Sequence, residues 1–328
     1  MGLGEFGRIE KYFKPLAAGF PGALGLNDDA AILTVSDLTR LVVSNDAVVA
    51  GVHFKTDDTP NLVARKALRA NLSDMAAMGA EPWVYTLTLA LGAGDAEASD
   101  AWVAGLADGL ASDQEHFGIH LIGGDSVTTP GPTMLSITIF GRQTGEGVLR
   151  RDGAQVGDDI YVSGTIGDAA LGLKLLNGDI DGNDQDMAAL LIDRYHLPRP
   201  RVALGVALLG SAHAAMDVSD GLVQDLSHIC AASYRAGVIF RANVPLSIPA
   251  RRLLDDGQVS DDDILGGGDD YELLFTAPAS ARDEIVRRAV AAGTLVTRIG
   301  KIGEGEGVTV HDSDGQLVPL RKLGYRHG

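Results

Sequence analysis

The chain has 328 residues, of which 45% are hydrophobic and only 5% aromatic, so two domains with mainly aliphatic cores are expected. A formal net charge of −17 excludes a basic nucleic-acid-binding face and argues against a role on an anionic membrane surface. The single cysteine, Cys230, excludes an intramolecular disulfide, and no segment is apolar over the length of a membrane span, so we expect a cytoplasmic protein without nucleic-acid or membrane partners.

The first half of the chain alternates helical and strand-like patterns. Helices are predicted over residues 5–13, 60–79 and 96–117, and strands over 28–35, 40–49, 83–91, 119–125 and 133–143. The strand at 119–125 is expected to run into a glycine turn. Residues 83–91 and 133–141 are apolar on both faces, which predicts that a partner sheet covers one side. Because neighbouring strands can also pair as hairpins, an α+β arrangement fits better than a doubly wound parallel sheet.

A polar, glycine-rich hinge near residues 145–150 predicts a domain boundary, which divides the chain into domains 1–148 and 149–328. The second domain is predicted to contain strands at 159–164, 238–244 and 271–276, helices at 168–176, after Pro200, at 222–236 and at 280–292, a polar loop at 177–186, and a terminal β-meander over 296–320. Cys230 falls in a predicted helix, as a small core residue.

Aspartate recurs beside small residues in otherwise apolar surroundings. The segments are 25–30, 43–54, 71–80, 121–126, 216–221 and 266–275. A carboxylate is costly to bury unless a positive group compensates it, and oxygen ligands are those that hard divalent cations prefer. The chain contains no GxxxxGK[ST], GxGxxG, HExxH, GxSxG or CxxC motif. We therefore predict phosphate chemistry in which metal ions and backbone amides hold the nucleotide.

Each of these residues also has a structural interpretation. Asp74 lies in a helical pattern, where it could pair with Arg69 or face solvent. Asp217 and Asp220 flank a predicted helix start, where N-capping would explain them. Asp28 and Asp29 could be turn residues. Arg150 and Arg151 could be a solvated pair at the hinge, and His53 could be a core histidine. The joint presence of the motifs favours the metal interpretation more than any single residue does.

Five motifs together resemble the thiamine-monophosphate kinase family, within the aminoimidazole ribonucleotide synthetase-like superfamily. They are DAVVAGVHF at 46–54, NLSDMAAMGA at 71–80, LIGGD at 121–125, DVSDGL at 217–222 and GGDDYELLF at 267–275. The resemblance spans residues 4–327. It implies an N-terminal α+β domain whose strands form a barrel at a homodimer interface, and a C-terminal α/β domain. It further implies that ATP and several Mg²⁺ ions bind between the two domains.

The resemblance also assigns roles to residues by matching motifs. The implied metal ligands are Asp29, Ser44, Asn45, Asp46, Asp74, Asp125, Asp217 and Asp220; the implied ATP contacts are Gly124, Asp125, Arg151 and Ser219; the implied substrate contacts are His53, Asp269 and Tyr325. Three residues depart from the family pattern, where Gly, Thr and Glu are usual. They are Asn27, Asn45 and Asp269. Asn45 preserves a ligand only if that position coordinates through its backbone carbonyl, and Asp269 is one methylene shorter than Glu.

The implied activity is direct transfer of the γ-phosphoryl group of ATP to thiamine monophosphate, giving thiamine diphosphate and ADP. The acceptor is a phosphate monoester with a second pKa of about 6, so no general base and no catalytic side chain of that kind is predicted. Mg²⁺ ions would bring the two anions together. The alternatives are a synthetase or selenide-type kinase of the same superfamily, although the latter would be expected to carry a reactive Cys or selenocysteine near its N-terminus, and a non-catalytic metal-binding module.

Overall fold

The computed structural model describes residues 5–26, 31–36, 40–93, 96–145, 147–182 and 184–325. The chain divides into two compact units, the first comprising residues 1–75 and 81–143 and the second residues 76–80 and 144–328. The main part of the second unit therefore begins at Thr144, close to the hinge predicted from the sequence. The last two residues of the helix Pro60–Ala77 also belong to the second unit. Of the predicted residues, Asn27, Asp28 and Asp29 lie outside the described residues.

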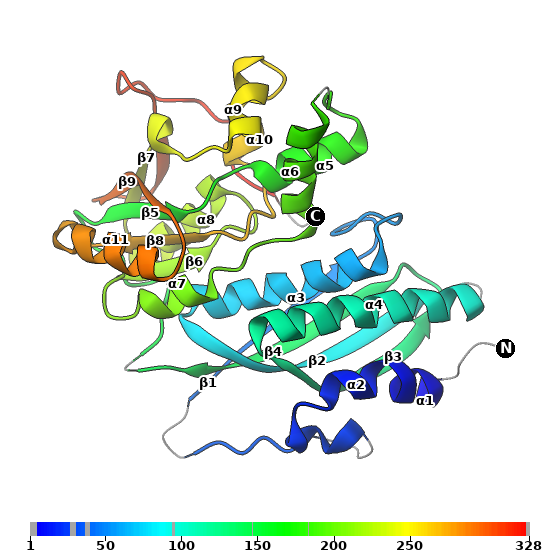
Figure 1. The fold of residues 1–328 in the computed structure, drawn as a ribbon. Helices are drawn as coiled ribbons and strands as arrows, with labels where there is room; N and C mark the ends of the chain where they lie inside the picture. The colour runs from blue at the N-terminus through cyan, green and yellow to red at the C-terminus, as the bar shows by residue number, and fades with distance from the viewer. Residues whose placement is uncertain are drawn as a thin grey trace. The chain divides into compact units, whose positions relative to one another are not determined.

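The first unit is built on a four-stranded sheet with strand order β1-β4-β2-β3 (Figure 1). The strands are β1 Leu41–Val49, β2 Ala80–Gly92, β3 His120–Thr129 and β4 Met134–Gln143. β1 pairs with β4 antiparallel, and β2 pairs with β3 parallel. The long helices α3 Pro60–Ala77 and α4 Ala96–Phe117 lie along one face of the sheet. The α+β prediction for this part of the chain is confirmed.

The N-terminal segment of the first unit is a chain of short helices that packs against β3 and α4. They are α1 Glu5–Arg8, a π-helical turn Ile9–Phe13, α2 Lys14–Ala17 and a 3-10 helix Pro21–Leu26. Arg8 Nε lies 2.7 Å from Asp100 Oδ1 of α4, which fixes the segment by an ion pair. The predicted strand at 28–35 is wrong for its described part, because residues 31–36 form no helix or strand.

One face of the first unit's sheet is uniformly apolar, and the other mixes hydroxyl and apolar side chains. Leu135, Ile137 and Ile139 of β4 are buried beneath the helices, while Ser136 and Thr138 alternate with them and remain half-buried. β2 repeats the pattern, with Thr86 and Thr88 half-buried between buried leucines. The second face also carries apolar side chains, because Phe140 of β4 and Val84 of β2 share the face of these hydroxyls and belong to a buried apolar cluster with Ile122, so the prediction of two apolar faces holds only in part. The composition of the run hid hydroxyl side chains that occupy alternate positions and so share one face.

The second unit contains a six-stranded mixed sheet with strand order β10-β7-β9-β5-β8-β6. The strands are β5 Asp159–Ser163, β6 Ala214–Asp217, β7 Ala236–Phe240, β8 Leu273–Ala277, β9 Val296–Gly303 and β10 Gly307–His311; the helices are α5 Asp168–Asn177, α6 Gln185–His196, α7 Val202–Ala207, α8 Leu222–Ser233, α9 Ile248–Asp255, α10 Asp261–Leu265 and α11 Arg282–Ala291, with 3-10 turns at Arg241–Asn243 and Ala279–Ala281.

The inner strands of this second sheet are buried on both faces, so the unit has two cores. One core contains Ile160 of β5 and Leu226 of α8, among others. The other contains Tyr161 of β5, Phe275 of β8 and Ile285 of α11, with the two aromatic rings stacked 5.1 Å apart. Successive residues of β5 thus enter opposite cores, which explains why its sequence is apolar without alternation. Cys230 is fully buried in the first of these cores, as predicted.

Three sequence predictions in the strands and helices need correction. Residues 119–125 do not end in a turn, because β3 continues through both glycines to Thr129; the register shift between Tyr85 and Thr86 skips Ile122, and Gly123 and Gly124 pair with Thr86 and Leu87. A Cβ added at Gly124 would lie 1.8 Å from the carbonyl oxygen of Leu87, so glycine is needed for this close approach. The sequence missed α6, whose first two residues, Gln185 and Asp186, fall in the predicted loop. The terminal meander is wrong, because β10 pairs in parallel with β7, which separates it from β9.

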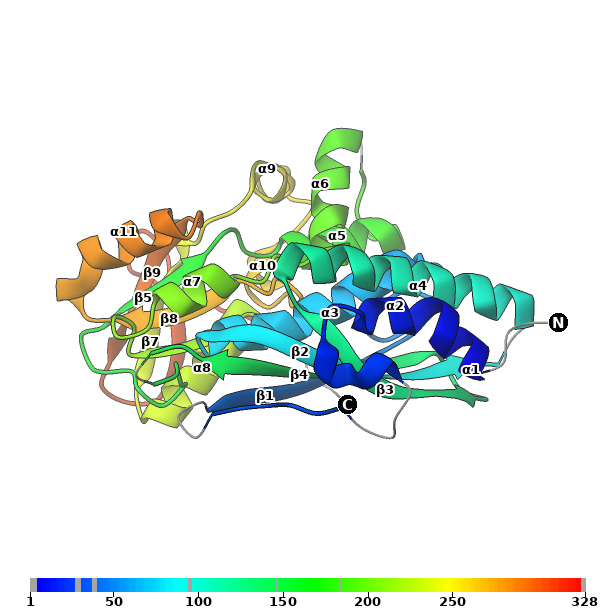
Figure 2. The ribbon, with the colours of Figure 1, turned by 60° about the horizontal axis from the view of Figure 1, so that its bottom comes forward.

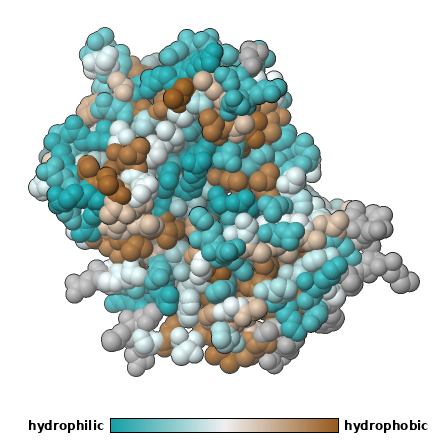
Figure 3. All heavy atoms as spheres, viewed as in Figure 1, coloured by the Kyte–Doolittle hydropathy of each residue, from teal (hydrophilic) through white to brown (hydrophobic). Residues whose placement is uncertain are grey.

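The surface is mixed in polarity (Figure 3). Hydrophilic and hydrophobic residues are interspersed over the face drawn in Figure 3. Among the residues that the structure describes, no helix has the length and apolar character needed to cross a membrane.

Candidate functional site

The first group of predicted site residues forms where β1 faces α3. Ser44 and Asp46 are two positions apart on β1 and therefore share a face. The hydroxyl of Ser44 donates to Asp74 Oδ2 over 2.5 Å, and the backbone N–H of Asp46 donates to Asn71 Oδ1 over 3.2 Å. Ser44, Asp46 and Asp74 are thus brought together by one strand and one helix.

Asp74 and Arg69 are held by different groups of the first unit. Arg69 donates from Nε and Nη2 to both oxygens of Asp113 on α4, at 2.7 and 2.9 Å, and Asp113 is fully buried. Asp74 is half-buried and accepts the hydrogen bond of Ser44. Asp74 is therefore in polar contact with Ser44 of β1, whereas Arg69, its expected partner on the same helix, pairs with Asp113.

Asn45 lies on the opposite face of β1 from Ser44 and Asp46. Its Nδ2 lies 2.9 Å from Thr138 Oγ1 and 3.0 Å from the carbonyl oxygen of Ile137, both on β4. The side chain is thereby directed along the hydroxyl-bearing face of the sheet. The Asn45 side chain is therefore not on the side of β1 where Ser44 contacts Asp74.

Gly124 and Asp125 lie on β3, at the other edge of the same sheet (Figure 2). Asp125 is exposed, and its Oδ1 accepts from the backbone N–H of Ser126 over 2.8 Å. β4 and β2 separate β1 from β3, so three interstrand spacings amount to roughly 14 Å. Within one chain, the structure therefore does not bring Asp125 together with Ser44 and Asp46.

His53 follows β1 in a turn and is half-buried. Its Nδ1 accepts from the backbone N–H of Val49 over 3.1 Å, and its own backbone N–H donates to the carbonyl of Val49 over 2.9 Å. Because Nδ1 accepts, the neutral ring carries its proton on Nε2. His53 is therefore prepared as a hydrogen-bond donor through Nε2.

The second group of predicted site residues forms in the second unit, around the loop between β6 and α8. The backbone N–H of Asp269 donates to the carbonyl of Ser219, and that of Tyr325 donates to the carbonyl of Asp220, both over 2.8 Å. Gln224 ties the same parts together, donating to Asp220 Oδ2 over 3.0 Å and to the carbonyl of Tyr325 over 2.7 Å. Segments about 50 residues or more apart in the sequence thus meet at one loop.

The N-capping interpretation of Asp217 and Asp220 is not supported. The N-cap of α8 is Gly221, with a φ of 137° and no side-chain cap. Asp225, within the helix, instead accepts from the backbone N–H groups of Asp220 and Gly221 over 3.1 and 3.0 Å. Asp217 ends β6 and is 5% exposed.

Asp225 is a candidate site residue that the sequence analysis missed. The pKa of Asp225 is raised to about 7, mainly by burial and also by the charges of Asp217 and Asp220, while the hydrogen bonds from the two backbone N–H groups oppose the rise. Within the described residues, ligand atoms of Asp220, Asp225 and His228 all lie within 4.8 Å of one another. The signal was present in the sequence, since Asp225 falls in the apolar stripe of α8 next to Leu226.

Arg150 and Arg151 differ in their surroundings. Arg150 pairs with Asp152 over 2.5 Å on the surface, which fits a solvated pair. The carbonyl of Arg151 accepts from the hydroxyl of Ser233 over 2.9 Å, which fixes its backbone. Its exposed side chain has no hydrogen bond or ion pair with the described residues, so Arg151 can reach an anion.

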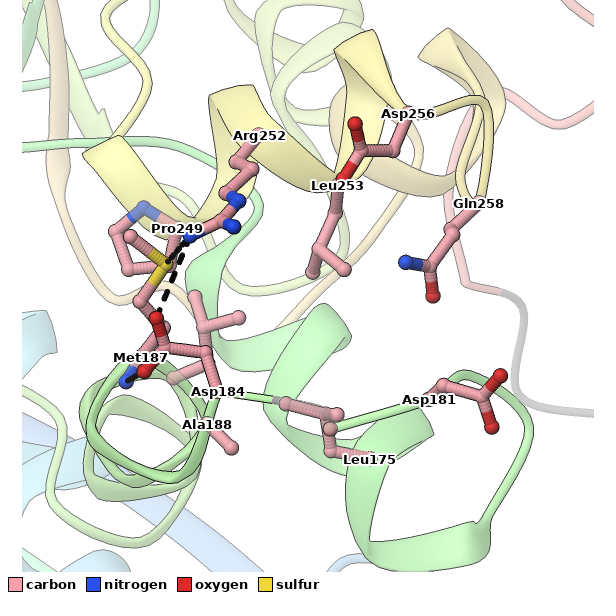
Figure 4. Close-up of a pocket in the computed structure, with 12 residues that line it drawn as sticks. Leu175, Asp181, Asp184, Met187, Ala188, Pro249, Arg252, Leu253, Asp256 and Gln258 are labelled. Carbon is pink, nitrogen blue, oxygen red and sulfur yellow. Dashed lines mark hydrogen bonds and ion pairs between the residues drawn. The ribbon is translucent and has the colours of Figure 1, made fainter.

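A cavity of about 130 Å³ lies elsewhere in the second unit, between α5, α6 and α9 (Figure 4). Leu175, Leu191 and Leu253 line it with apolar surface, and Asp181 and Asp256 add carboxylates. None of the predicted site residues lines it. The cavity is therefore separate from both groups of predicted site residues.

Comparison with known proteins agrees with the motifs. Residues 27–143 match the N-terminal domain of AIR synthase related protein, and residues 155–313 match its C-terminal domain. The chain therefore belongs to the AIR synthase related family, a class that the two aspartate-bearing domains define.

Within this class the chain is a member of the thiamine-monophosphate kinase family. It is 42% identical to thiamine-monophosphate kinase of Caulobacter vibrioides, over 99% of this chain and 91% of the relative. The crystal structure of thiamine-monophosphate kinase from Stenotrophomonas maltophilia K279a has a TM-score of 0.79 and 42% identity, covering 89% of this chain and 91% of that one. A structure of AaThiL complexed with AMPPCP and TMP has a TM-score of 0.77 and 30% identity, covering 91% of both chains.

Proposed function

We propose that this protein phosphorylates thiamine monophosphate with ATP and releases thiamine diphosphate and ADP. The observation that supports this most is the 42% identity to a thiamine-monophosphate kinase over 99% of the chain. The relative of known structure that is complexed with AMPPCP and TMP supports ATP as the co-substrate and thiamine monophosphate as the acceptor. The transfer is direct, because the dianionic acceptor phosphate is itself the nucleophile and needs no general base.

The two aspartate groups fit Mg²⁺ as the cation. Ser44, Asp46 and Asp74 offer oxygen ligands in the first unit, and Asp217 and Asp220 offer carboxylates in the second. The raised pKa of Asp225 reflects burial and an excess of negative charge that a divalent cation would relieve. Bound Mg²⁺ would neutralise the phosphates of donor and acceptor. That the two groups act on one ATP, with Asp29 as a further ligand, stays a prediction.

The remaining predicted residues have complementary roles in this proposal. Arg151 reaches the ATP phosphates as a cation, while Gly124 and Ser219 lie against the nucleotide. His53 donates from Nε2 to the substrate phosphate. Asp269 and Tyr325 hold the thiamine moiety, whose thiazolium is cationic and suits a carboxylate partner. Asp125, however, lies on β3, at the opposite edge of the first sheet from Ser44 and Asp46 of β1.

A homodimer would resolve this separation. If two first-unit sheets close edge to edge into a barrel, β3 of a second copy lies beside β1 and supplies its Asp125 to Ser44 and Asp46. Closure also covers the hydroxyl-bearing faces and removes exposed strand edges, which supports the barrel. The proposed homodimer is therefore part of the site. We expect it in the cytoplasm, which stays a prediction.

Mixing two inactive variants tests the shared site. Chains with Asp46→Asn and chains with Asp125→Asn are co-refolded or co-expressed with different tags. If each site combines residues of two copies, a mixed dimer has one intact site, and random mixing restores about a quarter of the wild-type activity. If each site lies within one chain, no activity returns. Sedimentation of the wild-type protein as a monomer at micromolar concentration would contradict the dimer directly.

The activity itself is tested by incubating the protein with Mg·ATP and thiamine monophosphate. Thiamine diphosphate and ADP should form in equal amounts, detected by mass. ATP turnover that needs a different acceptor would favour another enzyme of the superfamily. Binding of Mg²⁺ without ATP turnover would favour the non-catalytic module.

A further inference from the structure

A buried charge cluster lies next to the loop that bears Asp269, and none of the roles above uses it. Glu272, immediately before β8, is fully buried. Arg201 donates to both of its carboxylate oxygens, from Nε and Nη2, over 2.6 Å each. Arg194 of α6 and Ser163 of β5 each donate to one oxygen over 2.5 Å. These four residues are called the Glu272 clamp.

The clamp fixes one end of a strained segment. Asp269 and Tyr271 have φ angles of 69° and 49°, a left-handed conformation that costs L-residues roughly 1 kcal/mol or more each. Such a conformation persists only where the surroundings impose it. The segment is bound to the β6–α8 loop, since Tyr271 N–H donates to the carbonyl of Val218 and Val218 N–H donates to that of Glu272, each over 2.8 Å.

The residues on either side of Asp269 are also fixed. Asp270 is buried and accepts from the backbone N–H groups of Gly167 and Ala169 at the start of α5, over 2.7 and 3.3 Å. A Cβ at Gly268 would lie 2.5 Å from the carbonyl oxygen of Ser219. On the C-terminal side, the side chain of Glu272 anchors the segment, and its buried charge depends on the two arginines.

We infer that Glu272, Arg194 and Arg201 are positioning residues for substrate binding, which act through the conformation of Asp269. This inference rests on the proposed contact of Asp269 with thiamine monophosphate. Arg201 is the informative member, because its side chain is 19% exposed and its planar fork engages both oxygens. Loss of the fork leaves Glu272 short of positive charge and releases the strained segment.

The experiment compares Arg201→Met and Arg201→Lys with a control at the far end of β5. Arg282 forks Asp159 there in the same bidentate way, at 2.6 and 3.0 Å, and Asp159 is also fully buried. Arg201→Met should raise the KM for thiamine monophosphate about tenfold, more than the KM for ATP, which corresponds to about 1.4 kcal/mol. Arg201→Lys should give an intermediate KM, since Lys keeps the charge without the fork. Arg282→Met should lower the Tm while leaving both KM values within about twofold, as expected for a distant site.

A double-mutant cycle with Asp269→Ala separates positioning from general destabilisation. If Arg201 acts through Asp269, Arg201→Met should raise the KM for thiamine monophosphate no further once Asp269 is Ala. An additional tenfold rise in that background would overturn the inference, as would an equal effect of Arg282→Met. If Arg201→Met does not fold, Arg201→Lys decides by the same cycle. An unchanged KM in Asp269→Ala would overturn both the inference and the substrate role of Asp269, whereas continued formation of thiamine diphosphate would leave the kinase activity intact.

Discussion

Replacing Asp225 by Asn should remove a pH dependence of the free energy of unfolding that arises because the Asp225 carboxyl is buried in the folded protein. The Asp225 side chain is 1% exposed, and burial, followed by the nearby charges of Asp217 and Asp220, raises its pKa from 3.8 to about 7. Between these two values the folded state holds a proton that the unfolded state releases. The free energy of unfolding of the metal-free protein therefore falls as pH rises through this window.

The size of the effect follows from the shift. A rise of about three pKa units, at 1.36 kcal/mol per unit, sets an upper bound of about 4 kcal/mol for the penalty once both states are ionised above pH 7. An Asn at this position cannot ionise, and its amide oxygen can still accept from the backbone N–H groups of Asp220 and Gly221. The advantage of the variant should be near zero around pH 4 and should grow up to pH 7.

Urea unfolding at several pH values, in the presence of a chelator, measures this difference. The wild type and Asp225→Asn should have converging free energies of unfolding at low pH and diverging ones towards pH 7. A difference that stays constant with pH would refute the assignment of the shift to Asp225. Adding Mg²⁺ should restore stability to the wild type at pH 7 more than to the variant, because cation binding offsets the clustered charge.

Three further outcomes are expected. Asp74→Asn should abolish most of the kinase activity, with partial recovery in excess Mg²⁺, and should not lower the Tm of the metal-free protein, because it relieves like charges; near-normal activity would place Asp74 outside the site. Unphosphorylated thiamine should be a poor acceptor beside its monophosphate in the product assay, because it lacks the metal-binding anion, and equal turnover would contradict the mechanism. Asp113→Ala should lower the free energy of unfolding by about 3 kcal/mol or more, because it strands Arg65 and Arg69 near a buried site; a urea titration with an unchanged midpoint would show that the ion pairs do not stabilise the fold.

The helices of the first unit were predictable because their signals are local. The apolar spacing and the flanking residues gave α4 as 96–117, which are its observed bounds, and α3 to within two residues. Proline at the start of α3 and a glycine of positive φ shortly after its end act on the neighbouring backbone alone. By contrast, α6 was missed because its first turn carries the polar residues Gln185 and Asp186, which are typical of a loop.

The aspartate motifs were predictable as chemistry but not as geometry. The sequence contains the residues that match the family motifs. Asp225 was not predicted together with them, because a single carboxylate in a helix is usually solvated. Its burial against Asp217 and Asp220 depends on where α8 packs against the sheet. The opposite directions of Ser44 and Asn45 follow from strand alternation, yet which of the two faces α3 is a matter of packing.

The sequence by itself determined the α+β character of the first domain, the thiamine-monophosphate kinase family and the residue types of the site. Only the tertiary structure decided that β10 crosses to β7, that Ser44 and Asp125 lie at opposite sheet edges, and that Arg194 and Arg201 pair with the buried Glu272. The physical reason is range. Helix and strand periodicity depends on residues within a few positions, whereas strand order and buried charge pairing depend on segments that meet only when the core closes.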